Sequence, residues 1–280
     1  MLFPDVLVLV RGAGDLATGV LYRLHQAGFP VIATELPRPL VVRRTVAFAQ
    51  AVYDGECTVE GVRATRVDTV AAAQALAATG GLPVLPDPRD EVIVQIRPVV
   101  LVDARLLKRE DAARLDQAPL VIGLGPGFVA GVNCHAVIET NRGHRLGRVY
   151  WQGAAEADTG IPGAIAGFRE ERLLRAPSAG IWQPQVALGD RVEKGQVVGH
   201  VIGADGSVAV TAGLSGLVRG LLYPGLEVTP GMKLGDMDPR GDEETLFTIS
   251  DKSLAIGGGV LAAVLTWLNR RGNGELGTGY

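Results

Sequence analysis

The pattern of hydrophobic and polar residues in the first part of the chain shows two continuous apolar runs. Between them lies a segment in which the apolar residues have helical spacing. Residues 6–10 are wholly apolar, which predicts a strand buried on both faces. In residues 15–27 the apolar side chains recur every three or four positions, which predicts a helix that Gly28 ends. A second apolar run covers residues 31–34. These segments predict a βαβ unit, whose right-handed crossover places the two strands parallel in one sheet.

The pattern changes about halfway along the chain. Apolar runs at 92–96, 99–104 and 119–128 continue the first pattern, whereas the second half has short β-like pieces separated by glycines. The predicted fold class is therefore α/β, with a Rossmann-like parallel-sheet domain, then a small β domain and a C-terminal helix. The predicted boundaries are 1–145 for a nucleotide-binding domain, 146–250 for the β-rich domain, and 251–280 for the helix and tail.

An internal repeat supports the β-rich assignment. Residues 178–201 align without a gap on residues 214–237, and glycines coincide at several turns. Matched glycines and apolar positions indicate two copies of one β unit. The pattern resembles the biotinyl/lipoyl-like barrel-sandwich hybrid, which implies a small flattened barrel. Carrier proteins of that kind have a lysine in the hairpin between the halves, but residues 202–213 contain none, so we do not expect a swinging-arm carrier.

Composition narrows the class of protein. The chain has 280 residues, of which 47% are hydrophobic, so a sizeable core can form, and its net charge of −3 does not attract nucleic acid. The two cysteines, Cys57 and Cys134, form no CxxC motif, which is compatible with a cytoplasmic protein without a disulfide framework. The apolar N-terminus leads into a glycine turn, which is typical of a strand and not of a signal peptide. The apolar stretch 254–268 is short for a bilayer span, so we expect a buried helix and no membrane partner.

A glycine cluster follows the first predicted strand. Gly12 and Gly14, with a third small residue three positions on, have the spacing that turns the chain, admits a phosphate and lets the helix pack. Glu35 lies 21 positions after Gly14, where a dinucleotide fold places the acid that binds ribose. Asp15 would repel a phosphate there unless a cation such as Arg11 offsets its charge. We therefore predict a nucleotide site at these five residues; the alternative is a βαβ unit whose glycines are only structural.

A second glycine cluster follows a later strand. Gly123, Gly125 and Gly127 could form a nest of main-chain amides for an anion. Cys134 and His135 follow closely and could act as nucleophile and base, or as ligands of a soft metal. Adjacent strand residues point to opposite faces, so Cys134 could equally be a core hydrophobe. We predict cofactor binding at the three glycines and Cys134, predict no metal-ion site, and identify no catalytic residue.

Several stretches together resemble one family. They are "VRGAGDLATGVLYRL", "GLGPGFVAGVNCHAVIETNRGHRLGRV" and "DTGIPG", and they resemble the accessory proteins of the selenium-dependent molybdenum hydroxylase system, which are distantly similar to xanthine dehydrogenase accessory proteins. The resemblance implies a maturation protein whose partner is a molybdenum hydroxylase apoprotein. Its nucleotide ligand would be molybdopterin dinucleotide or NAD(P). Two other classes stay open: an NAD(P)-dependent oxidoreductase, and a non-catalytic scaffold that docks a partner through the β domain.

Overall fold

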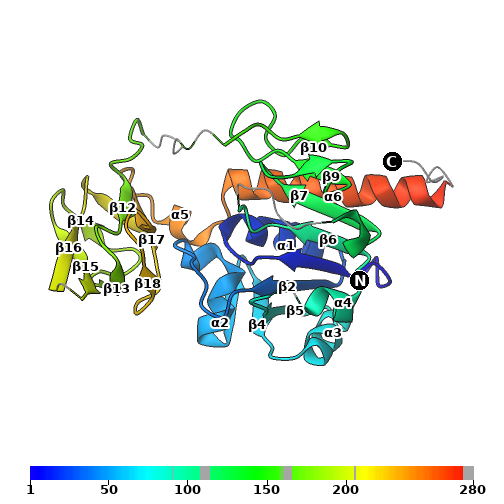
Figure 1. Ribbon diagram of the computed structural model, residues 1–280, viewed down its shortest axis with the longest axis horizontal. Helices are drawn as coiled ribbons and strands as arrows, with labels where there is room; N and C mark the ends of the chain where they lie inside the picture. The colour runs from blue at the N-terminus through cyan, green and yellow to red at the C-terminus, as the bar shows by residue number, and fades with distance from the viewer. Residues whose placement is uncertain (90, 108–113, 159, 161–165, 205, 274–280) are drawn as a thin grey trace. The chain divides into compact units, whose positions relative to one another are not determined.

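The structure is a computed structural model that describes all residues except 90, 108–113, 159, 161–165, 205 and 274–280. The chain divides into two compact units, each formed by segments that are distant in sequence (Figure 1). Unit 1 comprises Met1–Pro39, Ala47–Thr159 and Ile249–Tyr280, and unit 2 comprises Leu40–Val46 and Gly160–Thr248. The C-terminal segment 251–280, which we expected to stand apart, is therefore grouped with unit 1.

Unit 1 is built on a nine-stranded sheet with the order β10-β9-β7-β6-β1-β2-β5-β4-β3. The strands are β1 (Val8–Arg11), β2 (Val31–Glu35), β3 (Glu56–Val59), β4 (Val62–Arg66), β5 (Leu82–Pro86), β6 (Val100–Asp103), β7 (Leu120–Leu124), β9 (Ala136–Ile138) and β10 (Val149–Tyr150). A separate two-stranded sheet contains β8 (Val129–Ala130) and β11 (Gly153–Ala154).

The central strand β1 pairs in parallel with both of its neighbours. Val8 is in register with Val31 of β2 and with Val100 of β6. Val8, Leu9 and Val10 are 0% exposed, because helices cover both faces of a parallel sheet and leave no polar side for the strand. The parallel pairing of the first two strands that the apolar runs predict is confirmed.

The sheet as a whole is mixed, so the prediction of a parallel Rossmann-like sheet is wrong. β3 runs antiparallel to β4 at one edge, and β10 runs antiparallel to β9 at the other. The chain reverses between β3 and β4 at Glu60 and Gly61, whose φ angles are 44° and 79°. A two-residue turn with both φ angles positive matches the twist of an antiparallel pair. Local hairpins therefore extend a parallel centre at both edges.

The helices of unit 1 lie on both faces of this sheet. They are α1 (Asp15–Gln26), α2 (Ala51–Asp54), α3 (Val70–Ala78), α4 (Val92–Ile96) and α6 (Asp251–Gly272), with 3-10 turns η2 (Phe48–Gln50) and η3 (Leu115–Gln117). Helix α6, orange to red in Figure 1, packs against α1 and against β7, β9 and β10.

Helices α1 and α6 approach each other through small residues. A Cβ at Gly19 would overlap the backbone of Ser253, and a Cβ at Gly257 would overlap the carbonyl group of Gly19. Ser253 Oγ also donates a hydrogen bond to the carbonyl oxygen of Asp15 at 2.6 Å. These contacts place the first turns of the two helices side by side. The close approach is possible because neither glycine has a side chain.

One described helical segment, 244–272, is long and apolar enough to cross a membrane by length and composition alone. Within it, Ile256, Val260 and Val264 are 0% exposed, because α6 packs against α1 and the sheet of unit 1. This burial is typical of the core helix of a soluble protein.

Unit 2 contains two four-stranded antiparallel sheets, with the orders β12-β19-β17-β14 and β16-β15-β13-β18. Its strands are β12 (Leu173–Arg175), β13 (Gly180–Pro184), β14 (Arg191–Val192), β15 (Val197–Gly203), β16 (Gly206–Thr211), β17 (Gly216–Leu221), β18 (Glu227–Val228) and β19 (Lys233–Asp238). The unit also includes η1 (Arg44–Val46) and α5 (Glu244–Phe247).

The strands of the two repeated segments pair in equivalent ways. β13 pairs with β15 and β18, and β17 pairs with β19 and β14. The biotinyl/lipoyl-like barrel inferred from the repeat is nevertheless wrong. The repeat omits β12 and β16, which add one strand to each sheet, and among the described residues no strand of one sheet pairs with the other. The core between the sheets includes Trp182, whose Nε1 donates to the carbonyl oxygen of Leu222 at 3.2 Å.

Candidate functional site

The carboxyl ends of three neighbouring strands form the centre of the candidate site. β1 lies between β2 and β6, and the chain passes from β1 through α1 to β2, then later enters β6 on the opposite side. Such a change of direction is a topological switch point, where open α/β sheets bind ligands. The strand ends there are Arg11, Glu35 and Asp103.

The first glycine cluster makes the turn between β1 and α1. Gly12 has a φ of 98°, an angle that favours glycine, and a Cβ there would lie in van der Waals contact with the backbone carbonyl of Ala104 at 3.4 Å. Its amide donates to the carbonyl oxygen of Thr34 at 2.8 Å. Gly14 is the N-cap of α1 and has no side chain to cap the first turn. The amides of that turn therefore need a partner other than an N-cap side chain.

Glu35 lies against this loop, as the spacing predicts. Its Oε2 accepts a hydrogen bond from the amide of Ala13 at 2.9 Å, and its Oε1 accepts one from the amide of Leu36 at 2.7 Å. Burial raises the pKa of the Glu35 carboxyl above its ordinary value, and the two amide bonds lower it by less. The carboxylate thus ties the end of β2 to the glycine loop.

Arg11 belongs to a buried charge cluster at the same edge. Its Nη1 lies 2.7 Å from Oδ2 of Asp103, and these side chains are 4% and 1% exposed. Arg105 also contacts Asp103, with Nη2 to Oδ2 at 2.6 Å and Nε to Oδ1 at 3.1 Å. The sequence prediction missed Asp103 and Arg105. The signal was an acid near the end of the apolar run 99–104, but its pairing with Arg11 follows only from the strand order.

Asp15 faces the start of α6. Ser253 Oγ lies 3.3 Å from its Oδ1 and also donates to its carbonyl oxygen. Asp251, in the first turn of α6, accepts two hydrogen bonds from the guanidinium of Arg142, of 2.6 and 2.8 Å. The bonds with Asp251 raise the pKa of Arg142, and the negative charge of Asp15 adds to this effect. The carboxylate of Asp15, which we expected to disfavour a phosphate, therefore lies at the contact between α1 and α6.

The second glycine cluster is closely packed. A Cβ at Gly123 would overlap the ring of Phe128, and one at Gly125 would overlap Oγ1 of Thr140. Gly125 and Gly127 have φ angles of 73° and 101°. Close packing at Gly123 and Gly125, and the positive φ angles of Gly125 and Gly127, account for glycine at these positions without an anion-binding nest.

Cys134 is a core residue. Its side chain is 0% exposed, and burial raises the pKa of its thiol to about 12. The adjacent His135 has its Nδ1 occupied as acceptor for the amide of Val121 at 2.9 Å, and burial lowers its pKa. Gly123 is in register with Asp103 of β6, and Asp103 is in register with Arg11 of β1, so the second cluster lies at the same carboxyl edge as the first glycine loop, with β6 between them. In the described part of the chain, no group of three His, Cys, Asp or Glu side chains is arranged to hold a metal ion.

Comparison by sequence gives one strong likeness. No protein-family model matches the chain. The chain is 50% identical over 264 residues to the Escherichia coli (strain K12) protein described as "Uncharacterized protein YqeB". The match covers 94% of this chain but 48% of that relative, so the chain spans about half the length of the curated relative it matches.

Comparison by structure gives only weak likenesses. An aspartoacylase family protein from Mesorhizobium loti is 14% identical, with a TM-score of 0.29 over 82% of this chain and 84% of that one. The ectoine utilization protein EutE (DoeB) from Ruegeria pomeroyi is 12% identical, with a TM-score of 0.25 over 85% and 59%. A succinylglutamate desuccinylase/aspartoacylase from Rhodobacter sphaeroides is 19% identical, with a TM-score of 0.23 over 30% and 28%.

These comparisons overturn the family inferred from the sequence. None of the four proteins named above is described as an accessory protein of a molybdenum hydroxylase. Two of the three structural neighbours are named as aspartoacylase or desuccinylase proteins, and the third is named as an ectoine utilization protein. The maturation role and the selenium dependence that the resemblance implied are therefore wrong. The structural likenesses are too weak to carry a hydrolase activity to this chain, so the site geometry is the basis for a function.

Proposed function

We propose that unit 1 binds a small nucleotide at the carboxyl edge of its sheet, with a phosphate group at the loop of Gly12 and Gly14. The observation that carries the proposal is the position of this loop. It stands at the switch point between β2 and β6, where open α/β sheets take their ligands. The proposed function is ligand binding, and no reaction is assigned to it.

Three features favour a phosphate at this loop. The positive end of the α1 dipole stabilises an adjacent anion by about 0.3–1 kcal/mol at an exposed site. Gly14 presents no side chain, so an anion can reach the amides of the first turn directly. Arg105, whose side chain is 23% exposed, adds a guanidinium group at the neighbouring strand end.

Glu35 supports a ribose at the other side of the loop. Each of its oxygens accepts one amide hydrogen bond, and an ionised carboxylate offers about four acceptor positions. Free acceptor positions therefore remain for the hydroxyl groups of a ribose. Because the two amides fix the carboxylate, it needs little reordering to accept those bonds.

Calorimetric titration with ADP, NAD+ and inorganic phosphate tests the proposal. In Gly14→Val the added methyl groups occupy the space of the phosphate, and we expect affinity for the nucleotide that binds best to fall at least about tenfold. Gly258→Val is the matched control, because a Cβ at Gly258 meets open space. Equal affinity in the parent and Gly14→Val, or no binding of either nucleotide by the parent, would contradict the proposal.

We also propose that the protein works in the cytoplasm. Cys57 and Cys134 are both free thiols, which is typical of proteins in a reducing compartment. Cell fractionation with an antibody against the protein tests this placement, and recovery in an extracytoplasmic fraction would contradict it.

A further inference from the structure

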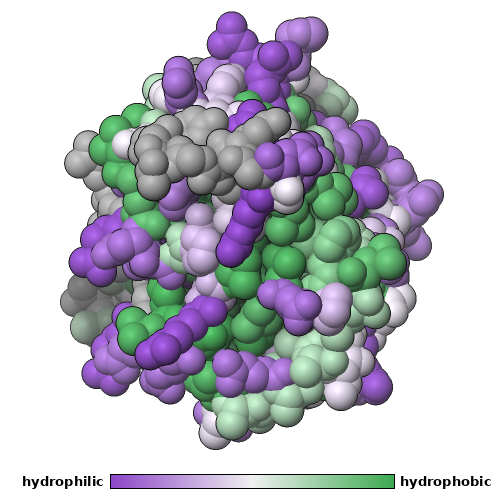
Figure 2. All heavy atoms as spheres, turned by 90° about the vertical axis from the view of Figure 1, so that its right-hand side faces the viewer, coloured by the Kyte–Doolittle hydropathy of each residue, from purple (hydrophilic) through white to green (hydrophobic). Residues whose placement is uncertain are grey.

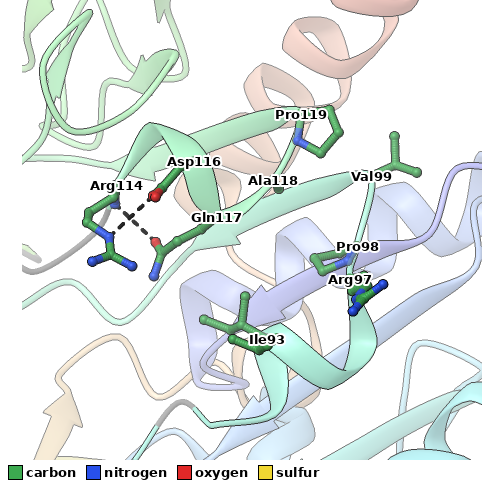
Figure 3. Close-up of a pocket in the computed structure, with 10 residues that line it drawn as sticks. Ile93, Arg97, Pro98, Val99, Arg114, Asp116, Gln117, Ala118 and Pro119 are labelled. Atoms are coloured by element: carbon green, nitrogen blue, oxygen red, sulfur yellow. Dashed lines mark hydrogen bonds and ion pairs between the residues drawn. The ribbon is translucent and has the colours of Figure 1, made fainter.

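Unit 1 has a cavity of about 940 Å³ at the edge of the sheet opposite the glycine loop. Val99 and Pro119, which line it, directly precede β6 and β7, so the cavity lies at the amino ends of these strands. Its other side is formed by α4 and the residue that follows it (Figure 3). The volume is within the range of about 300–1,000 Å³ that is usual for small-molecule sites.

The lining of the cavity is largely apolar. Ile93 and Ala118 are 5% and 8% exposed, and Pro98 is buried. Val94 also lines the cavity and is 75% exposed, so it offers apolar surface to a ligand. In Figure 2, viewed from the side where the strands begin and α6 ends, apolar residues gather in the middle of the face and polar residues border them. A ligand with an apolar body would pack on the apolar lining residues Ile93, Val94 and Pro98.

Arg97 supplies a cation at the rim of the cavity. It ends α4 in the left-handed conformation with a φ of 49°, and its amide donates to the carbonyl oxygen of Ile93 at 2.9 Å. This backbone conformation is unfavourable for arginine, and strained positions of this kind cluster at binding sites. Arg97 is exposed, and no carboxylate among the described residues forms an ion pair with it.

The second arginine at the cavity differs in this respect. Nε of Arg114 lies 3.3 Å from Oδ1 of Asp116, and the amide of Arg114 donates to Oε1 of Gln117 at 3.1 Å (Figure 3). Its charge is therefore matched by a neighbouring acid. Arg97 is the cation at the cavity whose charge no described acid matches.

We propose that this cavity binds a small organic anion with an apolar body. The anionic group pairs with the guanidinium of Arg97, and the body packs on Ile93, Val94 and Pro98. A guanidinium group forms strong, directional hydrogen bonds with carboxylate and similar anions, which accounts for a strained arginine at the rim. The site is separate from the glycine loop, so this proposal does not depend on whether the loop binds a nucleotide.

Two fluorescent probes with the same aryl body test the proposal. 8-Anilinonaphthalene-1-sulfonate carries an anionic group, and N-phenyl-1-naphthylamine does not. We expect the sulfonate probe to bind the parent saturably and about tenfold more tightly than the neutral probe. Arg97→Gln should remove that difference and leave the neutral probe unchanged, whereas Arg97→Lys should keep part of it. Arg63→Gln, which removes an exposed cation on β4, is the control and should bind both probes like the parent.

Several results would overturn the proposal. They are equal affinity of the parent for the two probes, an unchanged sulfonate affinity in Arg97→Gln, or an equal loss in Arg63→Gln. Absence of saturable binding of the sulfonate probe would overturn it as well. Far-ultraviolet circular dichroism of each variant shows whether a loss of binding reflects unfolding, and Arg97→Lys then separates charge from shape.

Discussion

Two neighbouring glycines of α6 are expected to respond to alanine in opposite directions. Gly257 packs on the carbonyl group of Gly19 in α1, and a Cβ there would overlap backbone atoms that no rotamer change can move. Gly258, one position along the same helix, has open space where its Cβ would lie. The pair Gly257→Ala and Gly258→Ala therefore separates helix propensity from helix–helix contact.

The magnitudes follow from the two effects. Replacing glycine by alanine inside a helix stabilises it by about 0.8–1.0 kcal/mol. Forcing an extra methyl group into a packed contact costs about 1–3 kcal/mol. Since Gly257 meets backbone, we take the upper part of that range, which leaves Gly257→Ala about 1–2 kcal/mol less stable than the parent. Gly258→Ala has no opposing cost and should be about 0.5–1 kcal/mol more stable.

Urea unfolding followed by circular dichroism measures both changes. For a domain of this size, each kcal/mol also moves the melting temperature by about 2–4 °C. The two variants should lie on opposite sides of the parent in both experiments. If Gly257→Ala is as stable as Gly258→Ala, then α6 does not pack on α1 as described, and the assignment of the C-terminal helix to unit 1 fails.

Three further predictions concern single residues. The pKa of Glu35 in the folded state lies above its ordinary value of 4.5, so its carboxyl contributes stability that is present below pH 4.5 and is lost as the pH rises through the folded pKa. In Glu35→Gln the urea midpoint should not show this fall with rising pH. A pH dependence equal to that of the parent would contradict the prediction. Burial raises the thiol pKa of Cys134 to about 12 and that of Cys57 to about 11, and only Cys134 is fully buried. Iodoacetamide at pH 8 should therefore label Cys57 first and Cys134 only on unfolding, whereas fast labelling of native Cys134 would count against its place in the core. Arg97→Gly should raise the free energy of unfolding by up to about 1 kcal/mol, because glycine adopts a φ of 49° without strain; a loss of stability would mean that the arginine side chain stabilises the fold.

Local sequence patterns were sufficient for the first βαβ unit. Continuous burial of Val8–Val10 requires an apolar run, and Gly12 has the positive φ that its place in the motif requires. The spacing from Gly14 to Glu35 placed the carboxylate beside the loop, where it accepts the amide hydrogen bond of Ala13. Each of these features depends on residues that are close together in the chain or joined by one helix.

Features that depend on long-range pairing could not be predicted in the same way. The ion pair of Arg11 and Asp103 joins residues 92 positions apart and exists because β6 lies beside β1. The packing of α6 on α1 depends on Gly19 and Gly257, which no local pattern relates. The same limit applies to Cys134: its sequence neighbours suggested a reactive thiol, but the strands around it bury it.

Hydrogen–deuterium exchange with and without saturating ADP tests the central claim most directly, because it locates a bound nucleotide on the chain. The account predicts slower exchange in peptides that cover the glycine loop and the first turn of α1, residues 12–18, and at the end of β2 around Glu35. Peptides of α4 at the opposite edge should be unchanged. Protection limited to α4, or unchanged exchange at residues 12–18 under conditions where calorimetry shows saturation, would contradict it.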